Sequence, residues 1–323
     1  MKRERCPLCR SEKCNVIRRK LRNGIKRRVL KCADCTFIFL EQSNKKLNAY
    51  YSEKDYRKKF GPNIKKTSSP QEIFETYLPF QKEIIKEIAS IIKPNMKILD
   101  IGCSTGHFLY SIKGLAKTRV GLELNKQAVS FIKRRLGFKV YSEPIERAKI
   151  KEGPFDLITV LQTLEHVPRP ISFLKNVSRH LKPTGYLYLE LPNIEDALLS
   201  IYKNQSYAGF YFREPHVSYF SKGTLKRLVE SCGFEGNIKT VQRYNFLNHL
   251  NWILTGEPQK SFVEGNQLPE LPIDSQIDPR IRGELDNLIK KTDKTYKKIL
   301  VKFGIAENLT FLGKKIKRPL ATI

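Results

Sequence analysis

The sequence predicts an α/β fold in which a mostly parallel β-sheet is covered by helices on both faces. Short apolar segments alternate with helical patterns between residues 95 and 192, and the turn DIGCSTG follows the first apolar segment. Regular alternation of strand and helix is typical of a parallel sheet. Two C-x2-C pairs ahead of this pattern indicate a small separate unit at the front of the 323-residue chain.

Residues 1–41 are expected to form a zinc-ribbon-like β unit. Two strands, over 15–20 and 27–31, would be joined by a turn at Asn23-Gly24.

Three regions follow this unit. Residues 42–94 are expected to be a connector and one leading helix that stops at Pro94, and residues 95–244 are expected to be the α/β core. The core strands are expected at KILDI, RVGLEL, KVYS, FDLITVL, YLYLELP and NIKTVQRY. Residues 245–323 are expected to form a helical extension with a Pro-rich loop and a basic helix, after which NLTFLG returns as an antiparallel last strand.

The chain is strongly basic, with a formal net charge of +28. Residues 1–70 contribute 21 Lys and Arg against 6 Asp and Glu, which fits a nucleic-acid surface, a solvated basic surface or a phosphate-bearing substrate. No apolar run approaches the ~18 to 20 residues that span a bilayer, so no membrane span is expected. The front of the chain lacks the apolar middle of a secretory signal, and we expect a cytoplasmic protein.

Four of the seven cysteines form the two C-x2-C pairs. In a reducing compartment such pairs favour a metal over disulfides, and four thiolates around one Zn²⁺ leave no open position for water. The alternative is a small β unit with four reduced cysteines. We expect a structural zinc site formed by Cys6, Cys9, Cys32 and Cys35. Cys14 is a spare cysteine that could compete as a ligand.

The turn DIGCSTG lies where α/β sheets bind ligands, at the carboxyl end of a central strand. Asp100 closes the strand, Gly102 lets the backbone approach a ligand, and Gly106 allows the next helix to pack tightly. Ser104 stands where a G-x-G-x-x-G fingerprint has glycine, so the pyrophosphate cradle is missing. A nucleoside without phosphate fits instead, because Glu123 ends the next strand and can accept the ribose hydroxyls.

Five phrases lie along residues 95–240: LDIGCSTGHFL, VGLELN, FDLITVLQTLEHVPRP, LKPTGYLYLELPN and EPHVSYFSKGTLKRLVESCGFE. Through them the chain resembles the class I S-adenosylmethionine-dependent methyltransferases, a family that usually has a second glycine where Ser104 stands. The resemblance implies a Rossmann-like fold and S-adenosylmethionine as cofactor. It also implies cofactor contacts in four groups: Asp100, Gly102, Cys103 and Gly106 for the methionine part, Glu123 and Leu124 for ribose, Ser142 and Glu143 near adenine, and Leu161 and Gln162 along the cleft.

The front of the chain adds CTFIFL, Tyr50, Tyr51 and Tyr56 to the two cysteine pairs. It resembles, more narrowly, the zinc-binding leader of bacterial methyltransferases in sugar and cell-surface polysaccharide pathways. This resemblance implies a small-molecule acceptor, namely a nucleotide-linked sugar or a related cell-envelope intermediate.

Methyl transfer from a sulfonium needs alignment and, for a poor nucleophile, a base. His166 in LEHVP and His216 in EPHVSYF are the candidates, with Glu165 or Glu214 to orient the imidazole. In the sugar C-methyltransferases that the chain partly resembles, a Tyr and a His before SYF perform the acid-base work. His216 matches that His, but the preceding YFREP departs from the pattern, so oxygen and nitrogen stay open as methyl acceptors.

Two other functions are weighed against this one. An rRNA or tRNA methyltransferase would use the basic zinc unit to bind RNA phosphates. The sequence, however, shows no evident motif for stacking on RNA bases. A non-catalytic binding module would have no need to retain Asp100, Gly102, Gly106 and Glu123 together.

Overall fold

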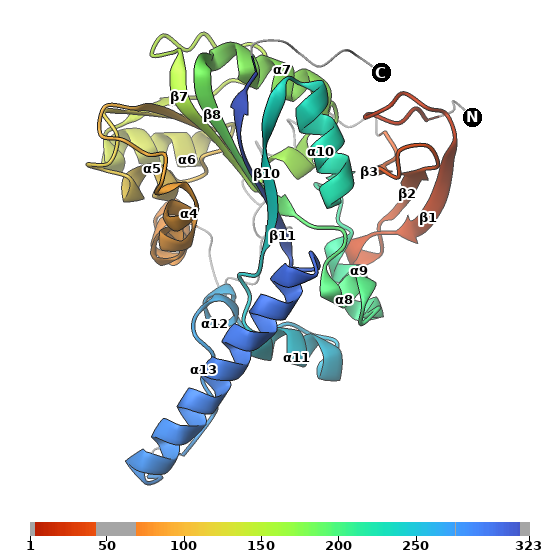
Figure 1. The fold of residues 1–323 in the computed structure, drawn as a ribbon, viewed down its shortest axis with the longest axis vertical. Helices are drawn as coiled ribbons and strands as arrows, with labels where there is room; N and C mark the ends of the chain where they lie inside the picture. The colour runs from red at the N-terminus through yellow and green to blue at the C-terminus, as the bar shows by residue number, and fades with distance from the viewer. Residues whose placement is uncertain (1–3, 43–68, 275, 317–323) are drawn as a thin grey trace.

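A seven-stranded sheet forms the centre of the computed structural model, which describes residues 4–42, 69–274 and 276–316. Its strands are β4 (Lys97–Ile101), β5 (Thr118–Leu122), β6 (Lys139–Tyr141), β7 (Phe155–Leu161), β8 (Leu181–Pro192), β10 (Phe234–Val241) and β11 (Asn308–Lys315). Their order is β10-β11-β8-β7-β4-β5-β6. Figure 1 labels the first four strands of this order. Strands β8 to β6 are parallel, and β11 is antiparallel to both of its neighbours. The mostly parallel sheet and the antiparallel last strand are confirmed.

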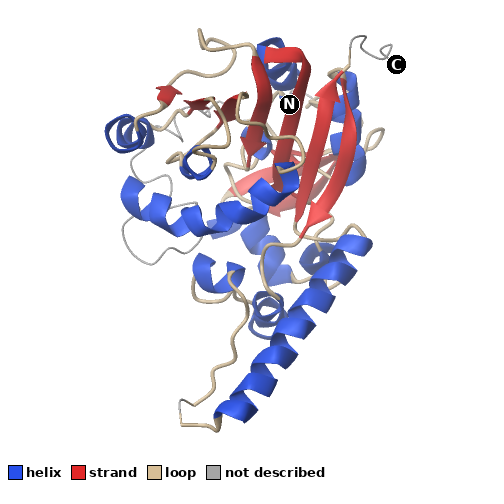
Figure 2. Cartoon of the chain, turned by 60° about the vertical axis from the view of Figure 1, so that its left-hand side comes forward, coloured by secondary structure: helices blue, strands red, loops and turns tan. Residues whose placement is uncertain are grey.

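Helices cover both faces of this sheet (Figure 2). One face carries α7 (Pro170–His180) and α10 (Lys222–Ser231). The other carries α3 (Pro70–Tyr77), α4 (Gln81–Ile88), α5 (His107–Ser111) and α6 (Lys126–Phe131), which continues as the π-helical turn η3 (Ile132–Leu136). Leu157 and Ile158 are neighbours in β7, yet they belong to the cores on opposite faces and both are fully buried. Burial on both faces explains why the central strands read as continuous apolar runs.

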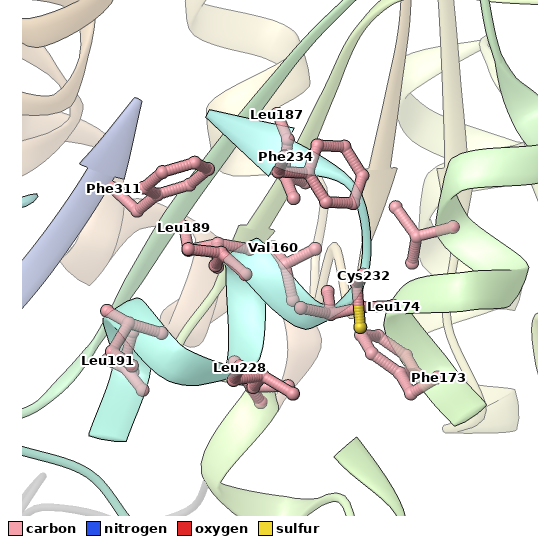
Figure 3. Packing of buried hydrophobic residues seen from close by; sticks show 14 of the residues in the cluster. Val160, Phe173, Leu174, Leu187, Leu189, Leu191, Leu228, Cys232, Phe234 and Phe311 are labelled. Atoms are coloured by element: carbon pink, nitrogen blue, oxygen red, sulfur yellow. The ribbon is translucent and has the colours of Figure 1, made fainter. Parts of the chain in front are cut away.

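Figure 3 shows the first of these cores from close by. The side chains of α7 and α10 meet those of the central strands there, so the two helices and the sheet share one apolar layer. The labelled residues are Val160, Phe173, Leu174, Leu187, Leu189, Leu191, Leu228, Cys232, Phe234 and Phe311.

The leading helix is broken where the sequence predicts one helix up to Pro94. Helix α3 begins with a capping box at Ser69, the chain then forms the 3₁₀ turn η2 (Leu78–Phe80), and α4 ends at Ile88. Pro79 causes the break, because proline lacks the backbone N–H and its ring clashes with the preceding turn.

The front unit is joined to the core by a shared sheet. Its strands are β1 (Cys14–Lys20), β2 (Lys26–Cys32) and β3 (Ile38–Leu40), and the fourth strand, β9 (Ser218–Tyr219), comes from the core. The 3₁₀ turn η1 (Arg22–Gly24) between β1 and β2 matches the expected Asn23-Gly24 turn, where both residues have positive φ. The predicted aromatic segment with Tyr50, Tyr51 and Tyr56 lies outside the described residues.

The C-terminal extension packs beyond one edge of the sheet and ends in a strand of that sheet (Figure 1). It contains α11 (Phe246–Thr255), α12 (Phe262–Asn266) inside the expected loop, and α13 (Pro279–Lys302). Because β11 then enters the sheet between β10 and β8, the core draws strands from both sides of the expected boundary at 244. The short helices α8 (Ala197–Ser200) and α9 (Gln205–Tyr211) and the turn η4 (Leu164–His166) complete the described structure. Within these residues no helix is long and apolar enough to cross a membrane.

Candidate active site

A cavity of about 1150 Å³ opens at the carboxyl ends of β4, β5, β7 and β8. It collects side chains from the glycine turn, from the segment after β5 and from the segments around Glu165 and His216, and α12 and α3 contribute to its wall. The predicted residues that line it are Asp100, Gly102, Cys103, Glu123, Leu124, Leu161, Gln162, Glu165, His166 and His216. Three predicted contacts, Gly106, Ser142 and Glu143, are not among its lining residues.

The turn after β4 depends on its left-handed residues. Gly102 has φ +78°, and a Cβ at this position would lie 2.1 Å from Thr163 Oγ1. Ser104 also has a positive φ, 52°, a backbone conformation that glycine adopts more readily than serine. Gly106, with φ +79°, caps α5, and a Cβ there would lie 2.5 Å from Phe138. Gly106 therefore allows α5 to pack tightly against the neighbouring residues.

Asp100 is a buried acidic residue that lines the cavity. Its Oδ1 accepts a hydrogen bond of 2.7 Å from Thr159 Oγ1, and burial raises the pKa of Asp100 to about 7. Cys103 packs tightly against Gly121, where a Cβ would lie 2.6 Å from its Sγ. Burial holds the pKa of the Cys103 thiol well above its ordinary value, so this cysteine is a packing residue and not a nucleophile.

Glu123 is held at the end of β5 by two backbone N–H groups. Ser104 N donates to its Oε2 and Asn125 N donates to its Oε1, both at 2.8 Å. These two bonds fix the carboxylate at the end of the strand, and a carboxylate there is an acceptor group suited to hydroxyl donors. Beyond β6, the cavity is lined by Pro144, Ile145, Glu146 and Arg147, which follow the predicted Ser142 and Glu143.

Glu165, His166 and His216 come together in the wall of the cavity. One side-chain ligand atom from each lies within 4.8 Å of the others, and the two imidazole centroids are 4.8 Å apart. His166 Nδ1 lies 2.8 Å from Pro215 O and therefore donates to it. His216 Nε2 accepts from Arg213 Nε at 2.9 Å, so Nδ1 carries the proton of the neutral ring. The adjacent guanidinium makes this cluster a poor place for a second cation.

Several polar atoms of this cluster are buried and unsatisfied. Among the described residues, both carboxylate oxygens of Glu165, Nδ1 of His216 and the hydroxyl of Tyr211 have no hydrogen-bond partner. All three side chains line the cavity, and buried polar groups of this kind are normally satisfied. Burial raises the pKa of Glu165 to about 8, lowers the pKa of His166 to about 3 and holds the pKa of His216 well below its ordinary value.

Sequence reasoning missed two walls of the cavity. The aromatic wall joins α3 and η2 to α12: the Phe262 ring lies 4.6 Å from that of Tyr77 and 5.3 Å from that of Phe80. No local sequence pattern predicts this contact. The polar wall contains the ion pair Arg243–Glu190, with N···O 2.7 Å. A glutamate within the apolar run YLYLELP was a usable signal for it.

The four predicted zinc ligands converge in the front unit. The Sγ atoms of Cys6 and Cys35, and those of Cys9 and Cys32, are 3.5 Å apart, and all four lie within 4.8 Å of one another. Four sulfurs at ~2.3 Å from one Zn²⁺ would be about 3.8 Å apart, so the arrangement fits this metal. Cys14 is not in the group.

A model of the family described as "Methyltransferase domain" matches residues 74–239. Two relatives are named ubiquinone biosynthesis O-methyltransferase. That of Thiobacillus denitrificans is 27% identical over 164 residues, covering 48% of this chain and 71% of its own. That of Nitrosococcus oceani is 32% identical over 121 residues, covering 36% of this chain and half of its own.

A solved structure of a SAM-dependent methyltransferase from Archaeoglobus fulgidus covers 76% of this chain and 97% of its own, with 21% identity and a TM-score of 0.48. The family match spans about half of the chain and contains the glycine turn, Glu123 and the buried Glu165 cluster. This chain belongs to the methyltransferase domain family and is an S-adenosylmethionine-dependent methyltransferase.

Proposed function

We propose that the protein transfers a methyl group to a hydroxyl oxygen of a small molecule bound in the cavity. The observation that carries this proposal is the set of unsatisfied polar atoms on Glu165, His216 and Tyr211, three residues that line one cavity. A polar ligand with hydroxyl groups would satisfy them. The curated relatives are named O-methyltransferases, which favours oxygen over nitrogen or carbon as the acceptor atom.

The cofactor fits the loop after β4 and the end of β5. Asp100 and the backbone from Gly102 to Ser104 would hold its methionine part, and Glu123 would accept the ribose hydroxyls. S-adenosylmethionine supplies an already activated methyl group, which leaves the protein to align the acceptor and remove its proton.

Glu165 is better suited than either histidine to take that proton. A base with a pKa near the working pH is the most effective, and the pKa of Glu165 is raised to about 8. His166 and His216 stay neutral because burial lowers their pKa values. His216 Nδ1–H and the Tyr211 hydroxyl would donate hydrogen bonds to the acceptor, and the Arg213 guanidinium next to His216 would stabilise the oxyanion that forms.

The acceptor class is tested with a panel. The protein is incubated with methyl-labelled S-adenosylmethionine and, separately, with phenolic compounds, nucleotide-linked sugars and transfer RNA. We expect label in a small molecule as an alkali-resistant methyl ether. A nucleotide-linked sugar also offers hydroxyls and stays in the panel, although the relatives' names do not favour it. Label in RNA, on carbon or on nitrogen would overturn the proposal.

We also propose that Cys6, Cys9, Cys32 and Cys35 bind one structural Zn²⁺. Their sulfur spacing and the small size of the front unit support a metal, because so few residues bury little apolar area without one. Such a site needs reduced thiols, in agreement with the cytoplasmic location proposed for the protein.

A further inference from the structure

Helix α13, 24 residues long, projects away from the sheet in both views (Figure 1, Figure 2). One side attaches it to the body, where Ile289, Asp293 and Leu300 are buried. Asp293 Oδ1 accepts a hydrogen bond of 2.7 Å from the backbone N–H of Phe246 in α11. The remaining sides face solvent.

An apolar stripe runs along one of the exposed sides. It consists of Ile281, Leu288, Ile299 and Phe303, whose relative exposures are 51, 61, 48 and 67%. They follow one another at intervals of seven, eleven and four residues, which are close to two, three and one turns of an α-helix. The four side chains therefore form one line along the helix and its last turn.

A basic stripe lies beside it. The helix contains eight Lys and Arg against three Asp and Glu. Arg280, Lys291 and Lys298 are exposed and are spaced by eleven and seven residues, so they also form a line. Because Arg280 and Lys298 directly precede members of the apolar stripe, the two lines are about 100° apart around the helix axis.

We infer that α13 binds the surface of an anionic lipid bilayer, with the apolar stripe in the headgroup boundary and the basic stripe on acidic headgroups. Amphipathic helices with Lys and Arg beside exposed apolar residues bind bilayers in this way. The charge argues against a second copy, since each chain carries +28. A nucleic acid would neutralise the basic stripe but leave the apolar stripe in water. Lys297 of the same helix lines the cavity, so docking would hold the active site near the bilayer.

The test is sedimentation of the full chain with two kinds of vesicle. We expect binding to phosphatidylcholine vesicles that contain one third phosphatidylglycerol, weakening as salt rises, and little binding to pure phosphatidylcholine. Replacing the three residues of the basic stripe with glutamine should weaken binding roughly 100-fold. Leu288→Ser with Ile299→Ser should weaken it at least about tenfold at constant charge.

Matched controls distinguish binding through α13 from binding through the overall charge and exposed apolar surface of the protein. Ile201→Ser with Ile17→Ser removes apolar side chains of similar exposure, 61 and 45%, and should leave binding unchanged. Replacing three exposed lysines outside the helix with glutamine should also leave vesicle binding unchanged. These lysines are Lys93, Lys113 and Lys117. The inference is overturned if the vesicles do not bind the protein, if controls and stripe variants weaken binding equally, or if the stripe variants instead abolish RNA binding or self-association.

Discussion

The backbone of Ile38 in the cysteine unit pairs with that of Tyr219, three residues after His216. Leu40 N also donates to Val217 O at 3.0 Å, and Val217 N in turn donates to the carbonyl oxygen of Glu165 at 2.9 Å. The cysteine unit is thus linked through β9 to both sides of the Glu165 cluster. We therefore expect the cysteine unit to help hold this side of the cavity in place.

Loss of the proposed zinc should loosen this part of the active site and spare the cofactor side. We expect Cys32→Ser to abolish bound zinc, to speed amide hydrogen exchange in β9, and to reduce turnover much more than cofactor affinity. The matched control is Cys14→Ser, which removes a cysteine outside the cluster and should change none of these. Unchanged exchange in β9 of the zinc-free variant would show that the unit does not support the site.

The base is identified by a pH profile. With Glu165 as base, turnover should rise about tenfold per pH unit up to a pH near 8, because the carboxyl must lose its proton to act. Glu165→Gln should lower the rate by ~10²–10⁴-fold and remove this dependence, while cofactor affinity measured by calorimetry stays within about twofold. If His216→Ala removes the pH dependence and Glu165→Gln keeps it, the histidine is the base.

Sequence patterns predicted the parts of this protein that depend on neighbours along the chain. The strands β4, β5 and β7, the glycine turn and Glu123 carry local signals, so all could be recognised. The β3–β9 pairing and the Phe262 wall join residues far apart in sequence, and nothing local marks either. The sequence predicts Glu165 only as a group that orients a histidine. Its proposed role as the base depends on its raised pKa, and that pKa results from burial that only the folded chain creates.

Two substitutions in the glycine turn should have opposite outcomes. Gly102→Ala places a Cβ 2.1 Å from Thr163 Oγ1 at a positive φ, so we expect loss of cofactor binding and a lower melting temperature. Ser104→Gly relieves the cost of a left-handed non-glycine residue, ~1 kcal/mol, but adds backbone entropy of similar size. It should therefore retain binding and change stability by less than about 1 kcal/mol. Calorimetric titration and thermal melts check both.

Cofactor binding should release a proton near neutral pH. Burial raises the pKa of Asp100 to about 7, so the empty site holds a partly protonated carboxyl. A cationic ligand favours the ionised form and lowers this pKa. The apparent binding enthalpy at pH 7 should therefore vary with the ionisation enthalpy of the buffer, and this variation should vanish in Asp100→Asn. Glu123→Ala should abolish binding itself, since it removes the proposed ribose contact.

Stability should fall as pH rises from about 6.5 to 8. Burial raises the folded-state pKa of Glu165 and Glu307 to about 8, and that of Asp100 to about 7. Above pH 4.5 the unfolded chain gives up these protons while the folded protein keeps them, so each group's contribution is lost as pH climbs through its folded pKa. Buried His166, with its pKa lowered to about 3, has the opposite slope, but only below about pH 6.5.

Urea unfolding at intervals of half a pH unit would measure this slope. Each carboxyl group with a raised pKa contributes up to about 1.4 kcal/mol per pH unit to the slope of the unfolding free energy. Glu165→Gln and Glu307→Gln should therefore each reduce this slope measurably. Glu230→Gln serves as the control, since that carboxylate is part of an open surface pair with Lys226 and should leave the slope unchanged. A free energy of unfolding that rises or stays level from pH 6.5 to 8 would contradict the burial of these carboxyls in protonated form.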